Sequence, residues 1–272
     1  MKISILGAGP IPNKLAQVLG GNSFVELFTS QEITIAGAEV FKYETFTSRI
    51  IDSEVVILAW RGLPSPGSEK ADVLKYLVQN ILPSSIIINL SSVAVYGQNP
   101  GINYETTAPK PINPYGQSKL DLEVYLNIFA ASKVCNLRIS NVFGDSNFND
   151  IVNKMLSAAL DNTTINLVEP HKIYRDYISI DFLIVVLRSF IDSSNQLGAR
   201  NLFNLSSGTS INLLQLKEII EVSLGAQIAF NTSELTLDTI EISKVSNLNL
   251  FLYSQISRND NLNDLNEYVT RK

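Results

Sequence analysis

The chain has 272 residues, of which 45% are hydrophobic and 17% charged, a composition that predicts a globular protein with a substantial core. The formal net charge of −5 argues against a nucleic-acid partner, because phosphate binding needs clustered Lys and Arg. The one cysteine excludes an intramolecular disulfide, and the one histidine leaves too few ligands for a structural zinc site.

No feature of the sequence indicates a membrane partner. Apolar stretches stay below the roughly 18 residues that a transmembrane helix needs. Residues 1–7 (MKISILG) hold a short apolar run without a small-residue cleavage site, so we interpret them as a strand and not as a signal peptide. We therefore expect a cytoplasmic protein.

Six short segments rich in Ile, Val and Leu predict buried strands. They are 3–6, 24–28, 55–59, 86–90, 137–140 and 202–205. Because these segments are apolar without alternation, they are typical of parallel strands covered on both faces. Helical spacing between them predicts helices over 13–19, 69–82 and 114–131. This alternation indicates an α/β fold with a Rossmann-type, doubly wound parallel sheet.

The pattern changes after about residue 141. Helices are predicted over 151–160 and 211–223, and short strands over 165–168 and 227–230. The tail from 247 onward is polar and rich in Asn, with intermittent leucine anchors. These leucines are Leu248, Leu250, Leu262 and Leu265. We expect the C-terminal third to form a second, smaller lobe.

The first predicted strand runs into residues 7–13 (GAGPIPN), a glycine-rich turn before a helix. Such a turn lets backbone N–H groups and the helix dipole meet a pyrophosphate. Read as G-x-G-x-x-G, the segment has Pro12 in place of the third glycine; the wider G-x-x-G-x-x-G spacing has Pro10 and Asn13 in place of its second and third. Each proline lacks an N–H, so two phosphate donors are lost. A tight turn without a ligand remains the alternative interpretation.

The end of the second predicted strand normally selects between the two dinucleotides. An acidic residue there binds the ribose 2′-OH of NAD, and a basic one favours the 2′-phosphate of NADP. Residues 28–31 read FTSQ, without a charge. Thr29 and Ser30 can hydrogen-bond either cofactor, so the choice between NAD and NADP stays open.

Residues 113–119 (NPYGQSK) predict the start of a helix, with Asn113 as the N-cap and Pro114 as the first helical residue. Tyr115 and Lys119 then lie one turn apart on one face. A nearby ammonium stabilises phenolate, so we expect Lys119 to lower the pKa of Tyr115 and fit it for proton exchange with an alcohol. The same spacing recurs from Tyr268 to the C-terminal Lys272, which we interpret as accidental.

A serine precedes this helix at the end of a predicted strand. Residues 91–97 read SSVAVYG, which places Ser92 at the carboxyl end of a parallel strand, where ligands of such sheets bind.

With these residues the sequence resembles the extended short-chain dehydrogenase/reductase family of nucleotide-sugar epimerases, dehydratases and ketoreductases, over nearly the whole chain. Further matching segments are 137–144 (LRISNVFG), 175–181 (RDYISID) and 203–208 (FNLSSG). The resemblance implies that Ser92, Tyr115 and Lys119 are catalytic. It also implies that Ser92, Asn141 and Arg175 bind a nucleotide-sugar substrate, with Arg175 gripping its diphosphate.

The resemblance further implies a cofactor site and a domain arrangement. The residues assigned to NAD or NADP are Gly7, Gly9, Ile11, Thr29, Ser30, Ala59, Tyr115 and Lys119. We expect a cofactor-binding lobe over 1–141, rejoined by 174–205, and a small substrate-binding lobe over 142–173 and 206–272. A homodimer through the Tyr–Lys helix and its neighbour is expected.

The implied reaction moves hydride between a sugar carbon and nicotinamide, while Tyr115 exchanges the hydroxyl proton and Ser92 hydrogen-bonds the same oxygen. Family dehydratases carry Asp-Glu directly after the catalytic Ser or Thr, where this chain has Val93 and Ala94, so we do not expect a 4,6-dehydratase. Epimerisation at C3 and C5 uses an extra Cys and His, and neither Cys135 nor His171 is suitably placed. The short chain favours reduction of a 4-keto sugar, with C4 epimerisation as the alternative.

A non-catalytic relative is a third hypothesis. The altered glycine turn and residues 60–62 (WRG), where the family usually has small residues, would both weaken cofactor binding. The protein would then be a nucleotide sensor or scaffold. The joint presence of the Ser, Tyr and Lys argues for an enzyme.

Overall fold

The computed structural model describes residues 1–43, 50–97, 99, 101–194, 201–233, 244–245 and 261–272. The chain divides into two compact units. The first comprises Met1–Val95, Pro111–Arg138 and Ile184–Phe203, and the second Tyr96–Lys110, Ile139–Leu183 and Asn204–Lys272.

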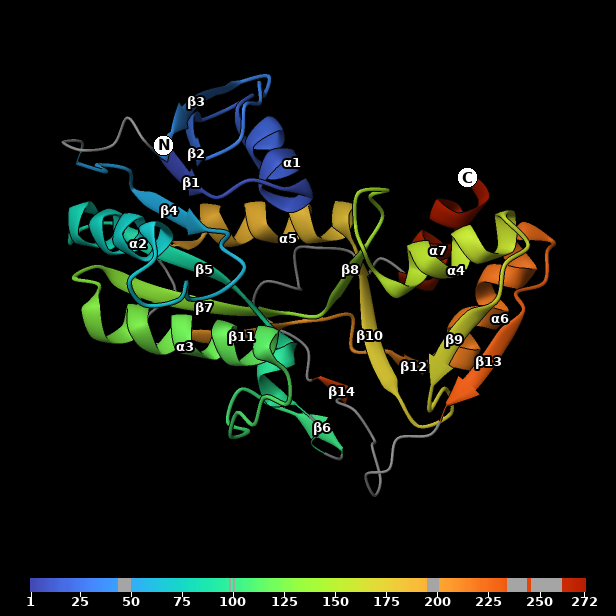
Figure 1. Ribbon diagram of the computed structural model, residues 1–272. Helices are drawn as coiled ribbons and strands as arrows, with labels where there is room; N and C mark the ends of the chain where they lie inside the picture. The colour runs from blue at the N-terminus through green and yellow to red at the C-terminus, as the bar shows by residue number, and fades with distance from the viewer. Residues whose placement is uncertain (44–49, 98, 100, 195–200, 234–243, 246–260) are drawn as a thin grey trace. The chain divides into compact units, whose positions relative to one another are not determined.

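The larger sheet has the strand order β11-β7-β5-β4-β1-β2-β3 (Figure 1). Its strands are β1 (Lys2–Leu6), β2 (Phe24–Thr29), β3 (Ala38–Lys42), β4 (Val55–Leu58), β5 (Ile86–Ser92), β7 (Lys133–Ile139) and β11 (Leu202–Leu205). The pairings β1–β2, β1–β4, β4–β5 and β2–β3 are all parallel. The predicted α/β, Rossmann-type fold is confirmed.

Helices pack on this sheet as their apolar stripes predict. They are α1 (Pro10–Leu19), α2 (Glu69–Asn80) and α3 (Pro114–Phe129). Leu74 and Leu77 of α2 and Leu122 and Leu126 of α3 share one core cluster with the strands. Alternate strand positions such as Leu6, Phe28, Val56, Leu58 and Ile87 complete that cluster. One face of the sheet is therefore covered by α2 and α3.

Two elements of this region are absent from the sequence predictions. The strand β3 has a half-exposed burial pattern, because it pairs at the edge of the sheet, and its residues lack the apolar run of a buried strand. The helix α5 (Ile180–Asp192) is apolar along most of its length, and Leu183, Leu187 and Phe190 have no exposed surface. Periodicity alone does not separate such a helix from a buried strand.

Among its described residues, the second unit contains three small sheets and three helices that lie wholly within it. Its sheets are β12-β10-β8, β13-β9 and β14-β6, formed by β6 (Ile102–Asn103), β8 (Asn141–Phe143), β9 (Ile165–Val168), β10 (Tyr174–Ser179), β12 (Ser210–Asn212), β13 (Phe230–Ser233) and β14 (Lys244–Val245). Its helices are α4 (Ile151–Leu160), α6 (Leu213–Leu224) and α7 (Asn261–Thr270).

The predicted strand at 227–230 is displaced in the structure. Ile228 is buried before the strand begins, and all four residues of β13 are exposed. The prediction followed apolar character, whereas β13 is defined by its backbone pairing with β9.

The C-terminal segment contributes to the core of the second unit. Leu265 and Val269 of α7 are buried in a cluster with residues of α4 and α6, such as Met155 and Leu216. Leu265 is thus an anchor as predicted, while Leu248 and Leu250 lie outside the described residues. None of the helices in the described ranges combines the length and apolar character needed to cross a membrane.

Candidate active site

The helix α3 begins where the sequence predicts. The Asn113 side chain accepts a hydrogen bond of 2.8 Å from the Gly116 N–H, and Pro114 occupies the first helical position. This start places Tyr115 and Lys119 on successive turns, with the Lys119 Nζ 5.9 Å from the centroid of the Tyr115 ring. The Tyr115 side chain is 46% exposed, so it is accessible to a ligand.

Gly116 lets α3 approach the end of β5 closely. A Cβ at this position would lie 2.4 Å from the Ala94 carbonyl oxygen, so only glycine fits without a shift of the backbone. The approach brings Tyr115 beside Ser92, the last residue of β5, and the Ser92 hydroxyl is within hydrogen-bonding reach of the phenol. Two of the predicted catalytic side chains therefore meet in the first unit.

Lys119 is buried beneath these two side chains. Its ammonium donates to the carbonyl oxygens of Trp60 and Leu90 at 2.5 and 2.6 Å, at the carboxyl ends of β4 and β5. Burial lowers the pKa of Lys119 to about 8, against an opposing effect of Glu123. The amine is therefore close to its titration range at neutral pH.

The expected lowering of the Tyr115 pKa by Lys119 is not what the structure gives. Burial raises the pKa of the phenol, and the groups that oppose this rise are Ser92 and the guanidinium of Arg61. The sequence reasoning placed the effective charge on Lys119. The Lys119 ammonium is held by the carbonyl oxygens of Trp60 and Leu90. The cation that opposes the rise of the Tyr115 pKa is Arg61.

A buried ion pair supports this arrangement from within the core. The Glu123 carboxylate, one turn after Lys119, accepts from the Arg138 Nε and Nη2 at 3.1 and 2.8 Å and from the Ser91 hydroxyl. Glu123, Arg138 and Ser91 are each less than 5% exposed. The sequence analysis missed this pair, although a Glu and an Arg within apolar stripes of a helix and a strand were an available signal.

The glycine turn between β1 and α1 has the strained backbone that glycine permits. Gly7 has φ of 123°, and a Cβ there would lie 2.9 Å from the Ala59 carbonyl oxygen. The Gly7 N–H donates to Phe28 at 2.8 Å, and the Gly9 N–H donates to the Asn13 side chain at 3.3 Å. Asn13, at one of the expected glycine positions, therefore occupies a donor of the turn.

A cavity of about 650 Å³ opens at the carboxyl ends of these strands. Its described lining is Gly7, Ala8, Thr29, Ser30, Gln31, Tyr43, Ala59, Trp60, Arg61, Gly62, Leu63, Pro64, Glu69, Lys70, Val73, Pro114, Tyr115 and Ser118. Of the residues predicted to bind the cofactor, this lining includes Gly7, Thr29, Ser30, Ala59 and Tyr115. Gly9, Ile11 and Lys119 are outside it, as is Ser92.

The cavity fits a dinucleotide in size and in chemistry. Its volume is within the roughly 300–1,000 Å³ typical of small-molecule sites. Hydroxyl groups of Thr29 and Ser30 line the end of β2, and the Thr29 Oγ1 already accepts from the Gln31 N–H at 2.9 Å. Gly7 and Ala8, which line the cavity at the turn, add no bulky side chain to it. These residues are suited to hold NAD or NADP.

Two aromatic residues that the sequence analysis did not assign together form part of the wall. The Trp60 Nε1 donates to the Tyr43 hydroxyl at 3.1 Å, and the ring centroids are 5.7 Å apart. Trp60 follows β4 and Tyr43 follows β3, so the pair joins strands that β1 and β2 separate in the sheet. Burial raises the pKa of Tyr43, which keeps it protonated.

The predicted substrate residues Asn141 and Arg175 belong to the second unit. Asn141 donates to the Asp176 carbonyl oxygen at 3.0 Å, and Arg175 lies on β10 opposite Ile211. The neighbouring Asp176 was not predicted as important. Its buried carboxylate accepts bonds from Ser140, Ser207 and Gly208, and it thereby ties β10 to the segments after β7 and β11.

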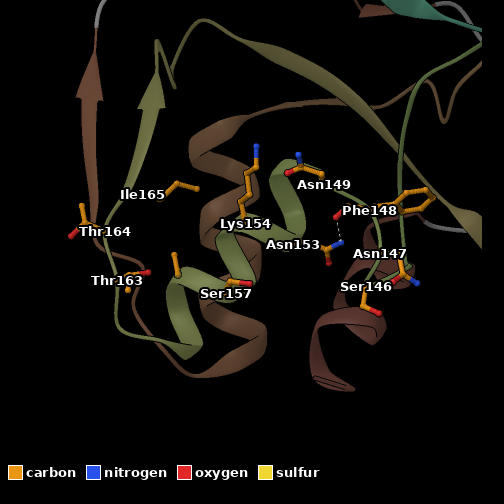
Figure 2. Close-up of a pocket in the computed structure, with 11 residues that line it drawn as sticks. Ser146, Asn147, Phe148, Asn149, Asn153, Lys154, Ser157, Thr163, Thr164 and Ile165 are labelled. Carbon is orange, nitrogen blue, oxygen red and sulfur yellow. Dashed lines mark hydrogen bonds between the residues drawn. The ribbon is translucent and has the colours of Figure 1, made fainter. Parts of the chain in front are cut away.

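A second hollow, of about 520 Å³, lies at the start of α4 (Figure 2). It is lined mainly by Ser, Asn and Thr side chains, with Lys154 as its charged member. Figure 2 shows the Asn153 side chain turned toward Phe148, whose carbonyl oxygen accepts its Nδ2 at 2.9 Å. Tyr268 donates to the same Asn153 side chain at 2.8 Å, so this residue organises the loop.

Cys135 and His171 take no part in these sites. Cys135 is fully buried, and burial raises the pKa of its thiol to about 12. His171 is exposed in a turn, as predicted for a solvated loop residue. In the ranges that the structure describes, no group of three or more His, Cys, Asp or Glu side chains is arranged to hold a metal ion.

Comparison with known families assigns the chain. Residues 70–205 match the family described as NAD dependent epimerase/dehydratase, and this match spans α2, β5, the Tyr–Lys helix and β7 to β11. The chain belongs to this family. The resemblance to this family proposed from the sequence is therefore confirmed.

Known relatives agree with this membership. Over 146 residues the chain is 33% identical to dTDP-4-dehydro-6-deoxyglucose reductase of Escherichia coli, a match that covers 51% of this chain and 45% of the relative. The chain thus matches about half the length of this relative.

Solved structures of the family share the fold. UDP-N-acetylglucosamine 4-epimerase from Methanobrevibacter ruminantium has a TM-score of 0.75 at 21% identity, covering 99% of this chain and 97% of that chain. UDP-glucuronic acid 4-epimerase from Bacillus cereus, solved with UDP-glucuronic acid and NAD, has a TM-score of 0.73 at 19% identity, covering 100% and 99%.

Proposed function

We propose that the protein is an NAD(P)-dependent oxidoreductase that reduces the 4-keto group of a nucleotide-activated sugar. The observation that carries the proposal is the meeting of Ser92 and Tyr115 beside a dinucleotide-sized cavity that begins at the glycine turn. Membership of the NAD dependent epimerase/dehydratase family supports the cofactor class.

Each residue has a defined role in this proposal. The bound nicotinamide supplies or accepts a hydride. Tyr115, exposed at the cavity, donates its proton to the sugar oxygen, and Ser92 hydrogen-bonds both the phenol and that oxygen. Lys119 holds the ribose hydroxyls of the cofactor, and the charge of Arg61 opposes the rise of the Tyr115 pKa. In the second unit, Asn141 and Arg175 bind the diphosphate of the substrate.

The sequence match to the Escherichia coli relative, 33% identity over 146 residues, favours reduction over epimerisation. The Escherichia coli relative is named a reductase of a 4-dehydro sugar nucleotide. Val93 and Ala94, directly after Ser92, cannot exchange protons, which argues against dehydration. Epimerisation at C4 is the second candidate, because it uses the same Ser, Tyr and Lys and because the structures with the same fold include 4-epimerases.

The experiment that tests the proposal uses the one tryptophan of the chain. Trp60 lines the cavity, so binding of NADH or NADPH there quenches its fluorescence by energy transfer. We expect quenching by at least one of the two, and oxidation of it on addition of a dTDP- or UDP-linked 4-keto-6-deoxy sugar. If neither dinucleotide binds at millimolar concentration, the protein is a non-catalytic relative.

A second measurement separates the two candidate reactions. A reductase consumes one NAD(P)H for each sugar reduced, whereas an epimerase converts a 4-hydroxy sugar nucleotide to its epimer with no net change in added cofactor. The Tyr115→Phe variant is expected to bind cofactor with unchanged affinity and to lose turnover in either reaction. Unchanged turnover in this variant contradicts the role assigned to Tyr115.

We further propose that the protein is a cytoplasmic homodimer. The outer face of α3 carries exposed apolar side chains, and these are Val124, Ile128 and Phe129, exposed to 49%, 65% and 60%. Contiguous apolar surface of this kind is typical of a protein contact.

A further inference from the structure

Arg61 places a positive charge just after β4, in the segment 60–62 where the family usually has small residues. It follows β4, which pairs directly with β1, and its exposed side chain lines the same cavity as Gly7 and Ala8 of the glycine turn. Within the described ranges no carboxylate forms an ion pair with Arg61. Its charge acts on two titratable groups, the phenol of Tyr115, which also lines the cavity, and the buried Lys119.

The glycine turn of this chain is short of hydrogen-bond donors. Pro10 and Pro12 occupy the first and third positions of α1 and carry no N–H. The Gly9 N–H is held by the Asn13 side chain at 3.3 Å. A phosphate at this turn would meet few of the N–H groups that usually bind it.

A guanidinium compensates for this loss in both charge and geometry. It is charged at every relevant pH, and its planar fork donates two parallel hydrogen bonds to a phosphate. Arg61, which has no acidic partner among the described residues, shares the cavity lining with the turn and can supply the donors that the turn lacks. The lysine that also lines the cavity, Lys70, is on α2 and has no such fork.

We propose that Arg61 binds the pyrophosphate of the dinucleotide and replaces the donors missing from the glycine turn. This inference rests on the proposed function, because it requires the cavity to hold NAD or NADP. It assigns the principal phosphate contact to the segment after β4 and leaves a reduced role for the helix α1. The altered turn is then compatible with firm cofactor binding.

The test measures cofactor affinity, with no turnover required. NADH and NADPH are titrated by calorimetry and by quenching of Trp60 fluorescence into the wild type, Arg61→Ala, Arg61→Lys and Lys75→Ala. Lys75, exposed on α2 and outside the cavity lining, controls for the lost charge. We expect Arg61→Ala to weaken binding about ten- to a hundredfold, as is usual for a charged hydrogen bond. Arg61→Lys should be intermediate and Lys75→Ala unchanged.

Two further ligands identify the group that Arg61 contacts. Adenosine, which lacks phosphate, should bind the wild type and Arg61→Ala equally when titrated by NMR. UDP, which represents the diphosphate of the substrate, should also bind both equally. A loss of adenosine binding in Arg61→Ala means that Arg61 shapes the adenine pocket, and a loss confined to UDP means that it binds substrate. Either result overturns the inference.

The failures of the inference and of the proposed function are distinguishable. If the wild type binds NADH or NADPH and Arg61→Ala binds it as tightly, the inference is wrong and the proposed function stands. A larger loss in Lys70→Ala than in Arg61→Ala also overturns the inference. If the wild type binds neither dinucleotide, the proposed function fails and the inference fails with it. Thermal melting of each variant verifies that it is folded.

Discussion

At the scale of single residues, the charge of Lys119 controls the proposed chemistry. Its ammonium is held by two carbonyl oxygens, and burial lowers its pKa to about 8. The protonated form, to which we assign the binding of the ribose hydroxyls, predominates below that pH and is lost as the pH rises through it. The Lys119 ammonium is thus held in place by two hydrogen bonds, but it loses its charge at a lower pH than an ordinary lysine does.

We predict that kcat/KM for reduction falls as the pH rises above about 8, because Lys119 then loses its proton. In Lys119→Arg the guanidinium keeps its charge, so whatever activity remains should not fall in that range. The measurement is a pH profile of kcat/KM for both proteins. A wild-type profile that stays flat well above pH 8, or the same fall in Lys119→Arg, contradicts the prediction.

The ion pair between Glu123 and Arg138 gives a second prediction at this scale. Glu123→Gln leaves the buried Arg138 charge without compensation, and the loss of one partner from a buried pair typically costs about 3–5 kcal/mol of unfolding free energy. Denaturant unfolding of the variant measures this loss. Glu218→Gln, an exposed change on α6, serves as the control and should differ little from the wild type. Equal stability of the two variants would show that the pair contributes nothing.

At the scale of elements, the contact between α3 and the end of β5 positions the proposed catalytic side chains. Gly116 makes this contact possible, since a Cβ would meet the Ala94 carbonyl oxygen. Sequence reasoning located both elements from local signals, the Asn-Pro start of the helix and the apolar run of the strand. It had no signal for the closeness of their packing, which depends on residues far apart in the chain.

We predict that Gly116→Ala displaces α3, lowers the unfolding free energy by about 1–3 kcal/mol and reduces kcat more than cofactor affinity. The control is Gly21→Ala, because a Cβ at Gly21 meets its nearest atom at 4.0 Å. Thermal or denaturant unfolding and single-ligand titration with NADH provide the measurements. A Gly116→Ala protein with normal stability and turnover would show that the close approach has no role.

At the scale of the whole molecule, the exposed apolar face of α3 bears on assembly. Burial of such side chains stabilises an interface at about 25 cal/mol per Å² of apolar surface. The rings of Tyr125 and Phe129 pack against each other on this helix, with centroids 4.8 Å apart and their planes tilted by 42°. A second copy of the chain is the proposed occupant.

We predict that Val124→Glu combined with Ile128→Glu converts a dimer to a monomer, because the charges would be buried at the interface without partners. Light scattering coupled to size-exclusion chromatography measures the mass. Val222→Glu, at a 79% exposed position on α6, is the matched control and should leave the mass unchanged. A wild type that is monomeric at every accessible concentration rejects the dimer.

The sequence by itself determined the α/β class, most strands and helices of the larger sheet, and the membership of Ser92, Tyr115 and Lys119 in one family pattern. The class and the elements follow from local signals, namely apolar runs, helical spacing and helix caps, which need no knowledge of distant contacts. The grouping of Ser92, Tyr115 and Lys119 follows from the resemblance of their segments to a known family. The half-exposed edge strand β3 and the apolar helix α5 were not predicted, because their local patterns are ambiguous.

Only the tertiary structure decided the electrostatics of the site. It placed Lys119 on the carbonyls of Trp60 and Leu90, and it brought Arg61 to the cavity of the glycine turn. It also reversed the expected direction of the Tyr115 pKa. The physical reason is that burial and charge act through space, between side chains that the sequence separates by tens of residues, whereas capping and periodicity act within a few turns of one element.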